Sequence, residues 1–96
     1  MKSVCIIFNS VLMPNVRAHL EKCNIDKYTQ WSGVTGVGEA GAHLGTHVWP
    51  GTNTMLFTIV TDEEKKDSLI SCVKAIREKH PGEGIKAFVL NVEEMV

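Results

Sequence analysis

Apolar and polar positions in the first third of the chain follow two different periods. Residues 3–8 are β-branched and apolar on both faces, which is typical of a central strand. Apolar residues then recur with helical spacing over residues 16–23, and Pro14 and Asn24 stand where helices commonly begin and end. Tyr, Thr, Trp and Val within residues 27–34 favour a second strand. The pattern therefore predicts a strand, a helix and a strand, in this order.

The second half repeats the alternation. Residues 54–60 are apolar on both faces and predict a strand. Thr61, with Glu64 three residues later, forms a capping-box pattern that predicts the start of a helix reaching about Lys79. A proline and two glycines then end the helix, and residues 86–92 predict the last strand.

The predicted order is β-α-β-β-α-β within one domain, residues 1–96. This order is typical of the α+β, ferredoxin-like split βαβ fold, a four-stranded antiparallel sheet with two helices on one face. The other face of the sheet must also be covered, because the strand at residues 54–60 is apolar on both sides. A 96-residue chain buries only about 60–65% of its unfolded surface, so we expect it to pack against further copies.

A glycine-rich segment, residues 35–53, separates the two halves and carries five glycines and one proline. Such a composition cannot sustain a helix and pairs only partly as strand, so it predicts a long loop. Long loops within small domains are usually functional or disordered.

Composition excludes several classes of protein. A net charge of -1 argues against binding to nucleic acid, and we expect no insertion into membranes, because no apolar run approaches the roughly 20 residues of a membrane span. Three widely spaced cysteines do not suggest a disulfide framework or a zinc ribbon, so a cytoplasmic location is expected.

Three segments, taken in order, resemble motifs of the PII signal-transduction family of nitrogen regulators. Residues 16–20, V-R-A-H-L, with Asn-Ile at 24–25, are similar to the family's V-R-x-x-L…G-I pattern. Residues 36–38, G-V-G, resemble the G-F-G at the base of its long T-loop. Residues 82–94 combine G-E-G and Lys86 with F-V-L-N-V-E-E, similar to the B-loop G-D-G-K followed by F-V-L-P-V-E-E.

The resemblance implies a homotrimer whose clefts between subunits hold an adenine nucleotide or another small anion. It also implies a T-loop-like segment, residues 36–53, that reports the ligand state to a partner protein, and a B-loop-like segment, residues 80–86. Glycine-rich turns can also present backbone N–H groups to an anion. The expected nucleotide- or anion-binding residues are Thr29, Gly36, Gly38, Gly82, Gly84 and Lys86.

The chain departs from the nitrogen regulators at the same motifs. Glu39 and Ala40 stand where those proteins have Arg-Gln, and Ile85 is an additional residue that displaces Lys86 or turns it to the opposite face of its strand. The loop is shorter than a full T-loop and lacks a Tyr or Ser at its tip, so modification there is not expected. These features look more like PII-like proteins associated with transporters and heavy-metal efflux pumps.

Histidines raise an alternative, a CutA-like trimer that binds a divalent metal. His43 and His47 are four residues apart in the loop, and His80 lies where the fold would bring it near. His19 and Cys23 are also four apart, but they fall on the core stripe of the first helix.

Other residues of chemical interest have simpler interpretations. Trp49, before a proline in the loop, is the candidate contact with a partner protein. Arg77 is expected on a solvated helix face. No nucleophile elbow or phosphate-binding lysine motif is present, so we expect no enzymatic activity. A third hypothesis is an oligomerisation module that binds no ligand.

Overall fold

The computed structural model describes residues 1–38, 41–43 and 51–96. Six strands, two α-helices and one short 3-10 helix make up the described part of the chain. In sequence order they are β1 (Lys2–Asn9), η1 (Ser10–Leu12), α1 (Met13–Lys22), β2 (Thr29–Val34), β3 (Gly36–Gly38), β4 (Gly41–His43), β5 (Asn53–Val60), α2 (Glu63–Lys79) and β6 (Ile85–Asn91).

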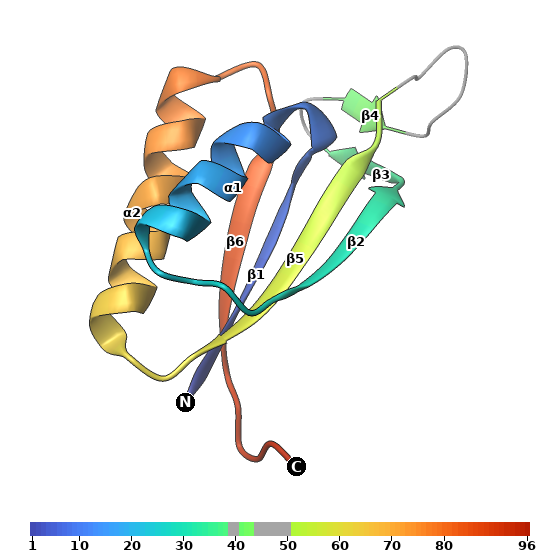
Figure 1. The fold of residues 1–96 in the computed structure, drawn as a ribbon. Coiled ribbons are helices and arrows are strands. Elements are labelled where there is room, and N and C mark those ends of the chain that lie inside the picture. Colours follow the sequence, from blue (N-terminus) through green and yellow to red (C-terminus); the bar gives the residue numbers. More distant parts are fainter. Residues whose placement is uncertain (39–40, 44–50) are drawn as a thin grey trace.

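Four of the strands form one antiparallel sheet in the order β2-β5-β1-β6. The two helices lie side by side across one face of this sheet (Figure 1). The predicted α+β, ferredoxin-like fold is therefore confirmed. The short strands β3 and β4 pair with each other as a separate two-stranded sheet within the predicted loop.

The core lies between the sheet and the helices. Burial alternates along β1 and β5, so every second side chain points toward α1 and α2. The buried apolar residues are Val4, Ile6, Phe8, Leu12, Val16, Leu20, Leu56, Val60, Leu69, Val73, Ile76 and Ile85. Two threonines of β5 are also buried here, and both are satisfied: Thr58 donates to the Lys27 carbonyl at 2.8 Å, and Thr54 shares a 2.9 Å hydrogen bond with Ser10.

The opposite face of the sheet, which we call the open face, is also apolar. The register of the strands places Cys5, Ile7, Trp31, Met55, Phe57, Ile59, Phe88 and Leu90 on it. Trp31, Phe88 and Leu90 are 45%, 46% and 54% exposed, and no described element covers them. A contiguous apolar surface of this kind is uncommon on a free monomer and marks an interaction site.

Helix α1 ends just before Asn24, as the sequence predicts, and the cap is left-handed. Asn24 has φ 56°, and its N–H donates to the Glu21 carbonyl at 3.1 Å. The Ile25 N–H donates to the Leu20 carbonyl at 2.9 Å, and the Ile25 side chain packs against the core. These bonds are those of a Schellman motif, which satisfies the last carbonyls of the helix.

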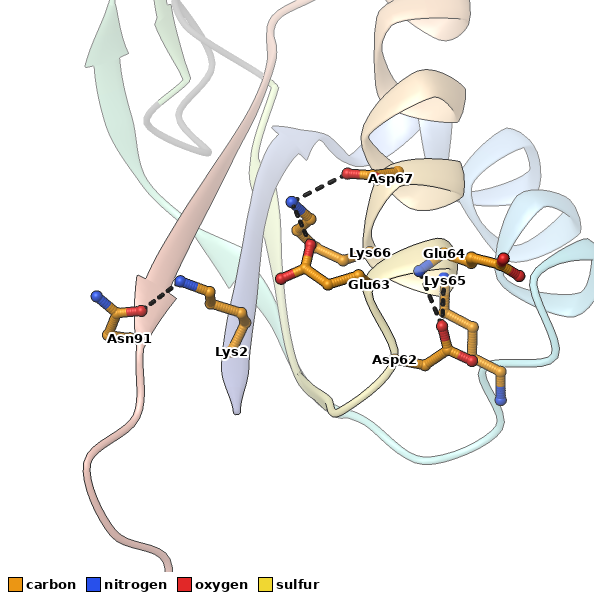
Figure 2. A network of polar contacts seen from close by, with 8 residues as sticks. All are labelled: Lys2, Asp62, Glu63, Glu64, Lys65, Lys66, Asp67 and Asn91. Atoms are coloured by element: carbon orange, nitrogen blue, oxygen red, sulfur yellow. Dashed lines mark hydrogen bonds and ion pairs between the residues drawn. The ribbon is translucent and has the colours of Figure 1, made fainter.

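The start of α2 differs from the prediction by one residue. The N-cap is Asp62, not Thr61, and its carboxylate accepts from the N–H groups of Glu64 at 2.8 Å and Lys65 at 3.4 Å (Figure 2). A carboxylate both accepts these bonds and carries the charge that the helix dipole favours, so it outcompetes a neighbouring hydroxyl. In the same first turn, hydrogen bonds from Lys66 to Glu63 and Asp67 raise the pKa of Lys66.

Strand β2 also departs from expectation. It begins at Thr29, two residues later than predicted, and its register with β5 shifts between Trp31 and Val34. Gly33, with φ 68°, lies within this bulge, where other side chains would be strained.

Among the residues described, no helix is long and apolar enough to cross a membrane.

The cap assignment predicts different costs for two adjacent substitutions. Asp62→Ala is expected to lower the free energy of unfolding by about 1 kcal/mol, because two helix N–H groups lose their acceptor. Thr61→Ala, at an exposed position, is the matched control and is expected to change it by less than about 0.5 kcal/mol. Urea unfolding at one fixed protein concentration measures both. If Thr61→Ala lowers the free energy of unfolding as much as Asp62→Ala, or more, the N-cap is Thr61, as the sequence predicts.

Candidate functional site

One end of the four-stranded sheet brings together segments that are far apart in the sequence. We call this end the rim and define it by Gly36, Asn53, Asn9 and Gly84. Asn9 ends β1, pairs with Asn53 at the start of β5, and donates its N–H to the Gly84 carbonyl at 2.9 Å. A Cβ added to Gly36 would lie 3.1 Å from Asn53 Nδ2, so Gly36 touches the same row. The rim therefore joins the bases of the two predicted glycine clusters.

The turn after α2 is fixed to the end of β1. His80 caps the helix, with its N–H donating to the Ile76 carbonyl at 2.9 Å, and the Glu83 N–H donates back to the His80 carbonyl at 3.0 Å. The Asn9 side-chain amide donates to the Glu83 carboxylate. The backbone and the side chain of Asn9 thus both hold this turn. In the sequence, the only indication of this role is that Asn9 directly follows a predicted strand.

Hydroxyl groups brace the neighbouring part of the rim. Ser10 Oγ lies 2.9 Å from Thr54 Oγ1 and 3.2 Å from Thr52 Oγ1, and the Ser10 N–H donates to the Thr52 carbonyl at 3.0 Å. These bonds tie η1 to the entry of β5. Each of these bonds joins two residues of the same chain, so their role is to hold the rim in position.

Gly82 and Gly84 are not required by the chain's own fold. A Cβ at either position would meet no atom within 4 Å, and neither residue has a positive φ. Gly36 differs, because its contact with Asn53 leaves little space for a side chain. Where neither packing nor backbone conformation requires a glycine, a close approach by a molecule from outside the chain is a reason for it.

Two cations flank this turn at the start of β6. The Arg77 guanidinium reaches from the exposed side of α2 and donates to the Ile85 carbonyl at 3.0 Å. Ile85 is buried opposite Phe8, so the additional residue fills the core and Lys86 lies exposed on the open face, opposite Ile7. Sequence reasoning assigned Arg77 only to a solvated helix face, because its approach to the next strand depends on how α2 and β6 pack.

Thr29 lies at the other side of the sheet. It begins β2 and pairs with Phe57, whereas Lys86 is on β6, three strand spacings or about 14 Å across the sheet. Within one chain the structure does not bring Thr29 to the turn at residues 80–84.

The remaining predicted residues are placed only in part. Gly38 pairs with Gly41, and His43 pairs with Gly36, in the β3-β4 ladder. His80 Nε2 lies 3.5 Å from Asn15 Nδ2. Glu39, Ala40, His47 and Trp49 lie outside the described residues, so the metal and partner predictions there stay predictions. Within residues 1–38, 41–43 and 51–96, no group of three or more His, Cys, Asp or Glu side chains is arranged to hold a metal ion.

Two shallow hollows lie on the helix side of the described structure. One, of about 440 Å³, lies under the end of α1 and is lined by residues that include Arg17, Asp26 and Tyr28. The other, of about 410 Å³, lies between α1 and the end of α2 and includes His19 and His80. The buried Nδ1 of His19 has no hydrogen-bond partner among the described residues. Neither hollow contains the expected anion-binding glycines.

Solved structures of similar fold belong to PII-like proteins. CPII from Thiomonas intermedia K12, bound to ADP, AMP and bicarbonate, gives a TM-score of 0.73 at 19% identity, over 97% of this chain and 88% of that chain. The same protein bound to ADP and bicarbonate gives 0.72 at 19% identity, with the same coverage of 97% and 88%. A PII-like signalling protein from Thermus thermophilus gives 0.62 at 25% identity, over 95% of this chain and 85% of that chain.

None of the curated proteins compared with this chain matches it significantly. The sequence model of the family described as nitrogen regulatory protein P-II, in contrast, matches residues 1–96. Together with the fold and the glycine turns at the rim, this full-length match shows that the chain belongs to the P-II family.

Proposed function

We propose that this protein is a PII-like regulatory protein that binds an adenine nucleotide, with or without a small anion, in clefts between copies of the chain. The observation that carries the proposal is the pair Gly82 and Gly84, which have no internal reason to be glycine and lie beside Arg77 and Lys86. Glycine allows phosphate oxygens to approach the backbone closely, and the two cations supply the attraction.

The two halves of the proposed site lie at opposite edges of the sheet, which favours assembly as a ring. Thr29 on β2 and Lys86 on β6 meet only when the β2 edge of one copy lies beside the β6 edge of the next. Contact between two different surfaces is heterologous, so it does not give a twofold dimer; it gives a ring when the rotation from one copy to the next closes. Three copies, the number implied by the PII resemblance, would also cover the open face.

Electrostatics at the turn favours a ligand whose negative charge lies near Lys86 and Arg77 and away from Glu83. The Glu83 carboxylate is held by Asn9, so it does not swing freely out of the way. A carboxylate this close to a bound phosphate opposes binding, which favours ligands with fewer phosphates or a small anion bound separately.

Ligands of the similar structures support this choice. CPII is described with ADP, AMP and bicarbonate, with ADP and bicarbonate, and with ADP, AMP and acetate. A small carboxylate-like anion beside a nucleoside mono- or diphosphate is therefore the ligand class that we propose for this chain.

The signal would pass to the segment 36–53. Gly36 lies on the rim and begins β3, so a ligand bound at the turn acts on the base of this segment. A ligand that contacts only one arrangement of the segment shifts its population toward that arrangement. A protein partner would respond to this arrangement, and the expected class of partner is a membrane transporter or efflux pump. The protein would act from a cytoplasmic location and would not catalyse a reaction of the ligand.

Nucleotide binding is predicted to depend on the bare backbone at residue 84. Gly84→Ala is expected to weaken ADP or AMP binding at least about 10-fold while leaving stability unchanged, because its Cβ meets nothing within the chain. Isothermal titration calorimetry with ATP, ADP, AMP and cyclic AMP, each with and without bicarbonate, measures the effect. Unchanged affinity in Gly84→Ala, or no binding of any of these nucleotides, would contradict the proposal.

The cations supply a matched pair of variants. Lys86→Ala is expected to weaken nucleotide binding by about 10-fold or more, whereas Lys74→Ala, at an exposed lysine on α2, is expected to leave it unchanged.

Separate titrations with Zn²⁺, Cu²⁺ and Ni²⁺ test the CutA-like alternative. A metal response that is lost in His43→Ala, without any nucleotide response, would favour that alternative.

Assembly is predicted to depend on the open face. Phe88→Lys is expected to convert a particle of three chains into single 10.6 kDa chains and to abolish nucleotide binding, because a charge cannot be buried unpaired between copies. Val11→Lys, at a residue that is 62% exposed outside the sheet, is the control and is expected to keep the assembly. Sedimentation equilibrium decides; a wild-type protein that sediments as single chains would contradict the ring.

A further inference from the structure

Two cysteines lie on the seam between the helices. Leu20 of α1 and Leu69 of α2 are both buried in the core. Cys23 and Cys72 follow them by three residues, so each continues the inward face of its helix. Figure 1 shows the end of α1 beside the middle of α2, and the two helices are in contact. The packing of the two helices therefore places both cysteines at the same seam.

The two side chains are neighbours across this seam. Burial raises the pKa of the Cys23 thiol, and the charge of Cys72 and a hydrogen bond to the Cys72 side chain raise it further, while Lys22 opposes the shift. Cys5 differs, because burial alone raises its pKa, and it lies on the open face of the sheet. All three cysteines are free and partly exposed.

We propose that Cys23 and Cys72 can form a reversible disulfide that links α1 to α2. The oxidant is a small-molecule disulfide such as oxidised glutathione. One protein thiolate attacks a sulfur of the oxidant, forming a mixed disulfide and releasing one glutathione thiolate. The second protein thiol, deprotonated, attacks the mixed disulfide at the protein sulfur and releases the second glutathione. Two S–H bonds are lost, one S–S bond forms, and the two electrons leave in two molecules of reduced glutathione.

The position of the pair suits such a reaction. Cys23 is the C-cap residue, at the end of α1, so its backbone adjusts more easily than the middle of a helix. The helix layer lies on the side of the sheet away from the open face, so assembly through that face leaves the thiols accessible. A link here would also fix the start of the segment 24–28, which lines the hollow beneath α1 and leads to Thr29.

The test treats the native, full-length protein with oxidised glutathione, blocks the remaining thiols with N-ethylmaleimide, and analyses it by mass spectrometry. The expected result is the loss of two of the three thiols, a mass lower by two hydrogens before blocking, and a tryptic cross-link between residues 23–27 and 67–74. Dithiothreitol is expected to restore all three thiols. Persistence of three free thiols, or separate glutathione adducts on Cys23 and Cys72 without a cross-link, would overturn the proposal.

Two variants make the result specific to the seam. Cys5→Ser is expected to form the same cross-link, whereas Cys72→Ser combined with Ser71→Cys moves the thiol about 100° around α2 and is expected to form none. Circular dichroism establishes that the double variant is folded. The same oxidation in urea is expected to give all three possible cysteine pairings, so a native protein that gives this mixture would also contradict the proposal.

Discussion

A four-stranded sheet with two apolar faces has helices for only one of them, and the rest of the structure depends on this imbalance. Leu56 and every second residue of β5 on the same face are buried against α1 and α2. Phe57, Phe88 and Leu90 face the other way, where no described element covers them. Burying such a surface is worth roughly 25 cal/mol per Å², so a small domain gains much of its stability by covering it with copies of itself.

The same imbalance bears on the proposed ligand site. The rim gathers Gly36 and Gly84 in one chain, but Thr29 lies at the far edge of the sheet. The site proposed here uses both edges, so it would exist only between copies, and assembly and ligand binding would depend on each other. Glu83, held by Asn9, would limit how much negative charge the proposed site accepts.

Local patterns predicted most of the fold, because strand alternation, helix spacing and the Asn24 cap each depend on neighbouring residues. The N-cap was misplaced by one residue because Thr61 and Asp62 both suit the role, and only geometry chooses between them. Arg77 and Asn9 were missed as parts of the site because their partners, Ile85 and Glu83, come from other elements. The proximity of Cys23 and Cys72 was equally hidden, since it arises only once the helices pack.

The central claim is that copies of the chain meet at their β2 and β6 edges and bind a nucleotide there. A crystal structure of the protein grown with ADP and bicarbonate tests it most directly. The account predicts a threefold ring with the open faces turned inward, and phosphate groups between Gly84 and Lys86 of one copy and Thr29 of the next. A ring that leaves the open faces exposed to solvent, or a nucleotide bound within a single chain away from residues 80–86, would contradict it.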